Sequence, residues 1–554
     1  MTPRPADPRP HDLVRNRIRF TVGIFALAFV ALIGRLVMFG LTPPTDTAAY
    51  VDPNAAIASS RPDIVDRNGE VLATDIKMAS LYAEPRNILD PDEAAEALAT
   101  VLPDLNVREV RDRLATNAGF AWIKREITPA QQAKIHGLGI PGIGFLSESR
   151  RFYPGGPTAS HIVGMVNVDN QGIAGFEKYL DDHGLADLHA AGFARTTEME
   201  PVRLSIDLRV QHILRDEISA AIERYSAIAG AGVVLNVHTG EVLAMVSLPD
   251  FNPNNPVDAN LPDRLNRMSA GAYELGSVFK SFTFAMALDS GAVTLADSVD
   301  ASSAIRVGRF TINDFHGKHR VLTVPEVFIY SSNIGSARMA LKVGIDRQQE
   351  YLRRFGLLDR VQTDLPEVAR PIVPAKWSEL TAMTVAFGHG LAVTPLATVV
   401  ADAALMNGGF LIPPTFQPRT RAEADKMAVR VISQRVSDQM RYLFRLNVET
   451  GSGGRAGVAG YAVGGKTGTA EKVENGRYSA NKRLNSFLAA FPMDDPQYAV
   501  LVLLDEPKAE KTGGGATAGS NAAPTVGAVI RRAAAILGVE PRDDKQMSAV
   551  LVSN

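Results

Sequence analysis

The stretch Tyr273-Glu274-Leu275-Gly276-Ser277-Val278-Phe279-Lys280 places a serine and a lysine three residues apart, directly after a glycine. Residues three apart are neighbours on one face of a helix, so the Ser277 hydroxyl and the Lys280 amine are expected within hydrogen-bond reach. A serine in the first turn of a helix also lies beside unpaired backbone N–H groups, which favour negative charge. The stretch therefore predicts an activated serine nucleophile.

Two later motifs make this signal specific. Ser331-Ser332-Asn333 follows along the chain, and Lys466-Thr467-Gly468-Thr469 lies nearer the C-terminus. Each motif is common by chance, but the three in this order match the signature of class A β-lactamases and penicillin-binding proteins. A second Lys-Thr-Gly, Lys511-Thr512-Gly513, lies among glycines that predict a mobile loop, so the sequence favours Lys466 for the third motif.

The residue types of the first two motifs suit acyl transfer. Lys280 can accept the Ser277 proton only when it is neutral, which requires burial and a nearby cation, such as Lys466, to lower its pKa. Ser331 can pass a proton to a leaving amine. Asn333 can hold both Lys280 and a substrate peptide bond, because its amide donates and accepts.

The third motif suits an anionic acyl donor. Its lysine offers a cation, its two threonine hydroxyls can bind a terminal carboxylate, and its glycine lets the backbone approach closely. The backbone N–H groups of Ser277 and Thr469 are expected to form an oxyanion hole. The predicted catalytic residues are Ser277, Lys280 and Ser331, and the predicted substrate-binding residues are Asn333, Lys466, Thr467, Gly468 and Thr469.

Composition argues against several other classes of function. The chain has 554 residues and a formal net charge of −2, which gives no electrostatic basis for nucleic-acid binding. It contains no cysteine, which rules out thiolate catalysis, disulfides and cysteine-bound zinc. His316 and His319 lie in a glycine-containing loop without a carboxylate at ligand spacing, so neither a metal nor a cofactor is predicted.

Residues 20–41 are apolar except for Thr21 and Arg35. As a helix they would be about 33 Å long, enough to cross the hydrocarbon core of a membrane. Several arginines precede the segment and residues 42–60 contain no lysine or arginine, so the positive-inside rule places the N-terminus in the cytoplasm. A cleaved signal peptide is the alternative, because the uninterrupted apolar run ends at Gly34, although no clear cleavage site follows.

At the three motifs the chain resembles the class B penicillin-binding proteins, and among them the division-specific transpeptidases of the FtsI type. The likeness covers nearly the whole chain. It includes residues 31–36, 61–73, 172–177, 387–395 and 466–471. Leu275 stands where many relatives have proline, and Arg61-Pro62 stands where Arg-Gly is common, but neither departure removes a reacting group.

The resemblance implies a serine D,D-transpeptidase that cross-links septal peptidoglycan stem peptides. D-alanyl-D-alanine would be cleaved, D-alanine would leave, and an amine of a neighbouring stem peptide would take the acyl group. Covalent inhibition by β-lactams is also implied. The implied location is the inner membrane at the division septum, with the catalytic domain in the periplasm. The implied partners are a membrane glycan polymerase of the FtsW type and other membrane proteins of the division machinery.

We expect an α+β fold in which helices cover an antiparallel sheet. Its strands are expected at 461–469, 485–491 and 498–504, with a closing helix at about 525–537. Arg61, Arg67 and Glu177 are interpreted as a structural ion-pair group. The expected parts are a cytoplasmic tail (1–19), a single transmembrane helix (20–41), a linker (42–60), an elongated pedestal domain of the dimerisation type (61–200), a penicillin-binding transpeptidase domain (201–540) and a tail (541–554).

Four alternatives remain open on sequence. An elongation-specific class B enzyme shares all three motifs, although the contexts Glu274-Leu275-Gly276 and Thr469-Ala470-Glu471 favour division. A β-lactamase would need a general base for deacylation, and no Glu-x-x-Leu-Asn pattern is found. A β-lactam sensor would have several membrane spans and a cytoplasmic module. A catalytically inactive division scaffold is the fourth, although every reacting residue is present.

Overall fold

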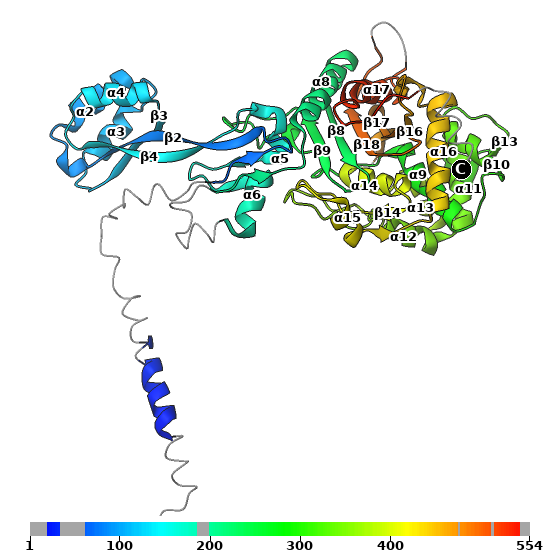
Figure 1. Cartoon of the computed structure of the whole chain (residues 1–554), viewed down its shortest axis with the longest axis horizontal. Coiled ribbons are helices and arrows are strands. Elements are labelled where there is room, and N and C mark those ends of the chain that lie inside the picture. The colour runs from blue at the N-terminus through cyan, green and yellow to red at the C-terminus, as the bar shows by residue number, and fades with distance from the viewer. Residues whose placement is uncertain are drawn as a thin grey trace, which may run out of the picture. The chain divides into compact units, whose positions relative to one another are not determined.

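The computed structural model describes residues 19–30, 32–33, 61–185, 199–474, 477–510 and 515–542 (Figure 1). The chain divides into two compact units. The smaller contains Met1–Ile57 and Met78–Glu148, and the larger contains Ala58–Lys77 and Ser149–Asn554. All eight predicted site residues belong to the larger unit.

The predicted membrane segment, residues 20–41, is described only in part. Residues 20–30 and 32–33 are helical, and their apolar side chains are exposed, while the remainder of the segment lies outside the described residues. Among the residues that the structure describes, no helix combines the length and the apolar character needed to cross a membrane.

Three helices and a small core build the smaller unit. The helices are α2 (Pro91–Val101), α3 (Val107–Leu114) and α4 (Pro129–Gly137), and they accompany β3 (Ala121–Ile127) and parts of β2 (Val71–Ala83) and β4 (Ile143–Phe152). Helix α2 begins after Asp90, whose carboxylate accepts hydrogen bonds from the N–H groups of Asp92 and Glu93. Leu81 and Leu98 are among the apolar side chains buried in the core.

A short hairpin begins the described part of the larger unit. Strand β1 (Ile64–Val65) pairs antiparallel with β2 across the Asn68-Gly69 turn, and β1 pairs in parallel with β7 (Val202–Arg203). Gly69 has a φ of 94°, a left-handed conformation that glycine adopts without strain. The carboxylate of Asp66 accepts the N–H groups of Asn68 and Glu70, which closes the turn. The Asn-Gly pair thus forms the tight turn of a β-hairpin.

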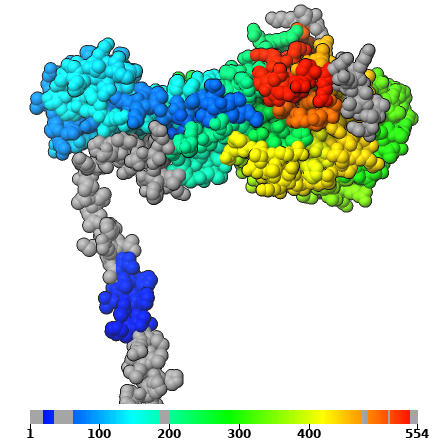
Figure 2. Space-filling model, in the orientation of Figure 1, coloured from blue at the N-terminus to red at the C-terminus, as the bar shows by residue number. Residues whose placement is uncertain are grey.

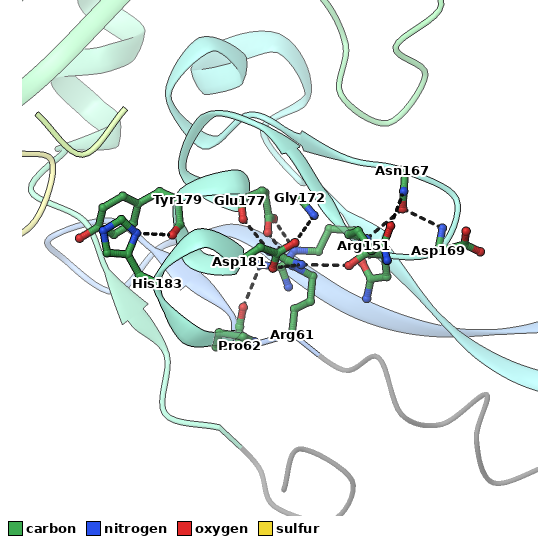
Figure 3. A network of polar contacts seen from close by, with 12 residues as sticks. Arg61, Pro62, Arg151, Asn167, Asp169, Gly172, Glu177, Tyr179, Asp181 and His183 are labelled. Carbon is green, nitrogen blue, oxygen red and sulfur yellow. Dashed lines mark hydrogen bonds and ion pairs between the residues drawn. The ribbon is translucent and has the colours of Figure 1, made fainter. Parts of the chain in front are cut away.

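A buried ion-pair network lies next to this hairpin (Figure 3). Arg61 Nε donates to Glu177 Oε2 (2.8 Å), and Arg151 Nε donates to Glu177 Oε1 (2.6 Å). Asp181 takes a second hydrogen bond from Arg61, and Asp75 takes one from Arg151. The side chains of Arg61, Arg151 and Glu177 are at most 1% exposed. Buried charges of this kind must be paired, so the network holds the segments that supply them together.

The predicted membership of this network was wrong at one position. Arg67 is not part of it, because its guanidinium lies 3.5 Å from the Ser205 carbonyl instead. Arg151, which the sequence analysis did not assign to the network, occupies the second arginine position. The short elements around the network are β5 (Met165–Val166), β6 (Gly172–Ala174), α5 (Ser160–Val163), α6 (Gly175–Leu180), η3 (Gly156–Ala159) and η4 (Asp181–Leu185). The short helix η2 (Pro85–Asn87) belongs to the smaller unit.

A five-stranded antiparallel sheet forms the centre of the larger unit. Its order is β16-β17-β18-β8-β9. The strands are β16 (Gly464–Glu474), β17 (Arg477–Phe491), β18 (Tyr498–Asp505), β8 (Ala229–Asn236) and β9 (Val242–Leu248). The antiparallel sheet expected from the last third of the chain is confirmed. Strand β16, which carries the Lys466 motif, lies at one edge.

Helices cover both faces of this sheet (Figure 1). Helices α8 (Leu208–Tyr225) and α17 (Ala522–Ala533) lie over one face, where α17 buries Val526, Val529 and Ile530. In Figure 2 the red surface of the C-terminal region lies beside the green surface of α8. Helix α14 (Pro395–Met406) covers the other face, and all its residues are buried. The expected closing helix is confirmed, although it begins at Ala522.

The remaining elements complete the larger unit around α14. The helices are η6 (Pro262–Arg264), η7 (Gly276–Phe279), α9 (Lys280–Asp289), α10 (Val324–Ile329), α11 (Asn333–Val343), α12 (Ile345–Arg354), α13 (Glu379–Val385), α15 (Arg421–Met427), α16 (Gln434–Thr450) and η8 (Gly454–Ala456). The short strands are β10 (Ser298–Asp300), β11 (Ile305–Val307), β12 (Phe310–Ile312), β13 (Val321–Thr323), β14 (Phe410–Leu411) and β15 (Val429–Arg430).

Candidate active site

The nucleophile candidate, Ser277, lies in a short helical turn whose first residue is Gly276. The turn is η7, which runs directly into α9, so that Lys280 is the first residue of the longer helix. Gly276 has a φ of 56°, and a Cβ there would lie 2.7 Å from the Thr469 carbonyl oxygen. The glycine therefore allows the Ser277 turn to pack directly on strand β16.

The amine of Lys280 lies within hydrogen-bond distance of four oxygens. These are Ser277 Oγ (3.0 Å), Ser331 Oγ (3.0 Å), the Ser331 carbonyl (2.5 Å) and Asn333 Oδ1 (2.8 Å). A neutral amine has two N–H groups and one lone pair. The two carbonyl oxygens can only accept, so they take the two N–H groups. The lone pair is then left for the hydroxyls, which is the arrangement that a proton acceptor for Ser277 requires.

Ser331 joins the two lysines of the site. Its hydroxyl lies 3.0 Å from Lys280 Nζ and 3.0 Å from Lys466 Nζ. Its φ of 56° is unusual for a residue with a side chain, and it directs both the carbonyl and the hydroxyl of Ser331 toward Lys280. A proton on the Lys280 amine therefore has a short path to the Ser331 hydroxyl.

Burial sets the protonation of both lysines. Lys280 and Lys466 are fully buried. Burial, together with the positive charge of Lys466, lowers the pKa of Lys280 well below its ordinary value, while the charge of Asp314 opposes the shift. Burial alone lowers the pKa of Lys466 to about 7. Both lysines thus lose a proton more readily than a lysine in water, and a proton acceptor for Ser277 requires this of Lys280.

The third motif lies along the edge strand β16. Thr467 Oγ1 lies 2.7 Å from Ser452 Oγ, and Thr469 Oγ1 accepts a hydrogen bond from the Ala518 N–H (3.3 Å). A Cβ on Gly468 would lie 2.5 Å from the Leu275 carbonyl oxygen, so the strand must pass close to the nucleophile turn here. Ser452 was not expected from the sequence, because no motif connects it to the strand.

A glycine loop after α13 supports the nucleophile turn from another side. The Gly276 N–H donates to the Gly388 carbonyl (3.3 Å), and a Cβ on Gly388 would lie 2.1 Å from the Gly276 carbonyl oxygen. The Gly390 N–H donates to Glu274 (2.9 Å), which also accepts the Tyr478 hydroxyl (3.1 Å). These contacts join three separate segments of the chain around Ser277.

His389, in the same loop, packs against an aromatic ring. Its ring centre lies 5.4 Å from that of Tyr478 and 5.4 Å from that of Phe387. Burial lowers the pKa of His389, partly opposed by Glu274. His389 is therefore placed as a packing residue beside these two rings.

The structure therefore brings five predicted site residues into one hydrogen-bonded cluster. Lys280 contacts Ser277, Ser331 and Asn333, and Lys466 contacts Ser331. The other three follow Lys466 on β16 and border the nucleophile turn. The competing motif Lys511-Thr512-Gly513 lies outside the described residues, apart from its flanks, so its exclusion stays a prediction.

A buried lysine that contacts a serine hydroxyl, beside a second lysine and a strand edge, has the features of a serine acyl transferase. Comparison with known proteins agrees. Residues 230–530 match the family described as the penicillin binding protein transpeptidase domain, and residues 56–184 match the penicillin-binding protein dimerisation domain. The chain belongs to the class B penicillin-binding proteins, and the FtsI-type resemblance is confirmed.

Relatives match over nearly the whole chain. A probable peptidoglycan D,D-transpeptidase FtsI of Caulobacter vibrioides is 40% identical, over 97% of this chain and 91% of that protein. The peptidoglycan D,D-transpeptidase FtsI of Escherichia coli is 29% identical, over 98% and 95%. A solved structure of penicillin-binding protein 3 from Mycobacterium tuberculosis, in complex with aztreonam, covers 87% of this chain and 97% of its own, with a TM-score of 0.67 and 24% identity. That likeness establishes a shared fold.

Proposed function

We propose that the protein is a serine D,D-transpeptidase that cross-links the stem peptides of septal peptidoglycan through an acyl-enzyme on Ser277. The observation that carries this proposal is the position of the Lys280 amine, 3.0 Å from the Ser277 hydroxyl and buried so that its neutral form is favoured. The names of the relatives support the peptidoglycan substrate and the division role.

The first half of the reaction forms the acyl-enzyme. Lys280 accepts the Ser277 proton while Oγ attacks the carbonyl carbon between the two D-alanine residues of the donor. The N–H groups of Ser277 and Thr469 stabilise the oxyanion. As the amide bond breaks, the proton passes from Lys280 through Ser331 to the leaving nitrogen, and D-alanine departs. The donor is then bound to Ser277 as an ester.

The second half transfers the acyl group to an amine of a neighbouring stem peptide. The amine attacks the ester carbonyl and loses a proton along the reverse path, through Ser331 to Lys280. The ester bond breaks, and Ser277 recovers its proton as the new amide forms. A β-lactam forms the same ester but carries no leaving group that departs, so it blocks the site.

Lys466 suits recognition of the donor carboxylate. Its pKa is about 7, so a bound carboxylate next to it would favour the protonated form. Binding of the anionic donor and charging of Lys466 would then reinforce each other. Thr467 and Thr469 lie on the same strand, and their hydroxyls complete the proposed carboxylate site, while Asn333 would hold the substrate peptide bond.

Division is proposed over elongation because the 40% identical relative carries the FtsI name. The proposal also includes a membrane anchor at 20–41, with the N-terminus in the cytoplasm and the catalytic domain in the periplasm. It places the protein in the inner membrane at the division septum. The proposed partners are an FtsW-type polymerase and other division proteins. The apolar run and the flanking arginines support the anchor. The family matches support a pedestal domain at 61–200 and a transpeptidase domain at 201–540.

Labelling with a fluorescent penicillin, followed by mass mapping of the adduct, tests the proposed chemistry. We expect the label on Ser277, and we expect Ser277→Ala to abolish it. Ser281→Ala is the matched control. Ser281 lies four residues after Ser277, in helix α9, and it is buried but is not one of the site residues. An adduct on another residue, or labelling that survives Ser277→Ala, would refute the assignment. Release of D-alanine from a stem-pentapeptide donor, with formation of a cross-linked product, tests the transpeptidase activity itself.

A further inference from the structure

A short segment outside the three motifs contacts the second motif at several points. Residues 313–314 follow strand β12. Asp314 Oδ2 accepts a hydrogen bond from Ser332 Oγ (2.7 Å), and Asp314 Oδ1 accepts one from the Ile334 N–H (2.9 Å). The carbonyl of Asn313 accepts a hydrogen bond from Asn333 Nδ2 (3.0 Å). The segment therefore contacts the motif on both sides of the Ser332–Asn333 peptide.

The contact with Asn313 fixes the orientation of the Asn333 amide. A carbonyl can only accept, so the NH₂ end of the amide must face Asn313. The Oδ1 end is then directed toward Lys280 Nζ, at 2.8 Å. A reversed amide would place two acceptor oxygens opposite each other at the Asn313 end, and it would turn the NH₂ group, which can only donate, toward Lys280. The backbone of 313 thus determines which atom the lysine contacts.

The contacts with Asp314 fix the turn that presents Ser331. Ser332 is the N-cap of α11, and its Oγ accepts the Gly335 N–H (2.9 Å). Its hydroxyl proton is therefore free to be donated, and Asp314 accepts it. Ser331, immediately before, has a left-handed φ of 56°, a conformation that costs about 1 kcal/mol or more and needs support from its surroundings.

Asp314 also acts on Lys280 through its charge. Lys466 on β16 is the cation near Lys280, and Asp314 is the anion that opposes it. His389, in the loop after α13, lies close enough to respond to the Lys280 charge. Helix α11 supplies the neutral Asn333. Helix α14 carries Asp402, whose pKa burial raises well above its ordinary value. Asp314 is thus the carboxylate that opposes the lowering of the Lys280 pKa.

We propose that Asp314 is a positioning residue for the acyl transfer assigned to Ser277, acting through Ser332, Ile334 and Lys280. The inference rests on the proposed function and extends it to a residue that none of the three motifs contains. Asp314 touches no reacting atom. It braces the turn that carries Ser331 and Asn333, and its negative charge offsets part of the effect of burial on the Lys280 amine.

The substitution Asp314→Asn separates charge from shape. The amide can accept from the Ile334 N–H with its oxygen and donate to Ser332 Oγ with its nitrogen, so the turn should persist. Loss of the negative charge lowers the pKa of Lys280 further, so neutral Lys280 survives to more acid pH. We expect the acid limb of the acylation rate to move down by about one pH unit, with the plateau nearly unchanged.

Two further variants complete the experiment. Ser332→Ala removes the hydroxyl but keeps the carboxylate, so we expect the plateau to fall about ten- to a hundredfold while the acid limb stays in place. Asp300→Asn is the matched control. Like Asp314, Asp300 accepts hydrogen bonds from a serine hydroxyl and from a backbone N–H, in this case both of Ser302. Unlike Asp314, it is exposed and is not among the charges that shift the pKa of Lys280. We expect it to match the wild type.

Stopped-flow acylation by a chromogenic β-lactam between pH 4 and 9 gives each profile, and circular dichroism confirms that each variant is folded. An unmoved acid limb in folded Asp314→Asn would overturn the inference, as would an equal shift in Asp300→Asn or in Ser332→Ala. A wild-type protein that takes no label at Ser277 would instead refute the proposed function. The two failures are therefore distinguishable.

Discussion

The hydroxyl of Ser331 lies 3.0 Å from the amine of Lys466, where the second and third motifs meet. Because burial lowers the pKa of Lys466 to about 7, the charge on this amine changes within the physiological range. Burial and the charge of Lys466 also lower the pKa of Lys280 well below its ordinary value. In the proposed mechanism the two amines have different tasks, since Lys280 must be neutral to accept a proton and Lys466 must be charged to attract a carboxylate.

The acylation rate should therefore fall on both sides of neutral pH. Toward acid pH, Lys280 becomes protonated as the pH falls through its lowered pKa, and it can no longer accept the Ser277 proton. Above about pH 7, free Lys466 loses its charge, which weakens binding of an anionic substrate and raises KM. Stopped-flow acylation from pH 5 to 9 should give a bell-shaped kcat/KM.

Lys466→Arg provides the control for the alkaline limb. Arginine stays charged throughout this range, so the loss above pH 7 should disappear even if the rate is lower overall. An alkaline limb that persists in this variant would show that another group is responsible, and a flat wild-type profile would contradict both assignments.

The two Lys-Thr-Gly motifs should differ sharply in their importance. Lys466→Ala removes the buried amine beside Ser331, so acylation should fall about a hundredfold or more. Lys511→Ala should change the rate by less than about fivefold, because its glycine-rich neighbourhood predicts a mobile loop. Acylation of the two variants at matched melting temperature compares them directly. If Lys511→Ala is the more damaging change, the third motif has been misplaced.

Glu177→Gln should destabilise the larger unit. Glu177 contacts both Arg61 and Arg151 in the buried network, and removal of its charge leaves two buried cations short of a partner. Breaking a buried pair in this way costs about 3–5 kcal/mol. Asp425→Asn, which breaks the exposed Arg421–Asp425 pair, should have little effect. Urea unfolding of both variants should be followed by tryptophan fluorescence and by loss of penicillin binding. Equal urea midpoints for Glu177→Gln and Asp425→Asn would contradict a stabilising role of the network.

Tyr478→Phe should loosen the segments around the nucleophile turn. The variant keeps the ring that packs against His389 but removes the hydroxyl that donates to Glu274. Loss of one hydrogen bond of about 1 kcal/mol should lower the acylation rate about fivefold without changing the melting temperature. Tyr442→Phe, on the exposed side of α16, serves as the control. A rate equal to that of the control would mean that the Glu274 contact does not support the site.

The sequence predicted the parts of the site that the chemistry constrains most tightly. A serine nucleophile, its amine neighbour and a glycine beside the oxyanion can each be recognised from residue type and spacing. The antiparallel sheet was also predictable, because β17 and β18 are apolar runs separated by turn residues. These features depend on local sequence, which is why the prediction and the structure agree on them.

Other parts depend on contacts between distant segments, which no spacing reveals. Asp314 is an ordinary loop aspartate until Ser332 is placed beside it. Arg151 belongs to the ion-pair network only because the fold brings it to Glu177, and no spacing in the sequence distinguishes it from Arg67. Ser452 reaches Thr467 only because α16 ends beside β16. A single sequence contains no signal for such pairings.

The close approach of Gly388 to Gly276 has a consequence for how susceptibility to β-lactams could change. No side chain fits at Gly388 while Gly276 keeps its place, since the added carbon would meet the Gly276 carbonyl at 2.1 Å. Substitution at 388 would push on the backbone one residue before the nucleophile and would alter the entry of a drug and of the natural donor together. Such a change would leave Ser277, Ser331 and Lys466 untouched, and a survey of clinical or laboratory variants restricted to the three motifs would overlook it.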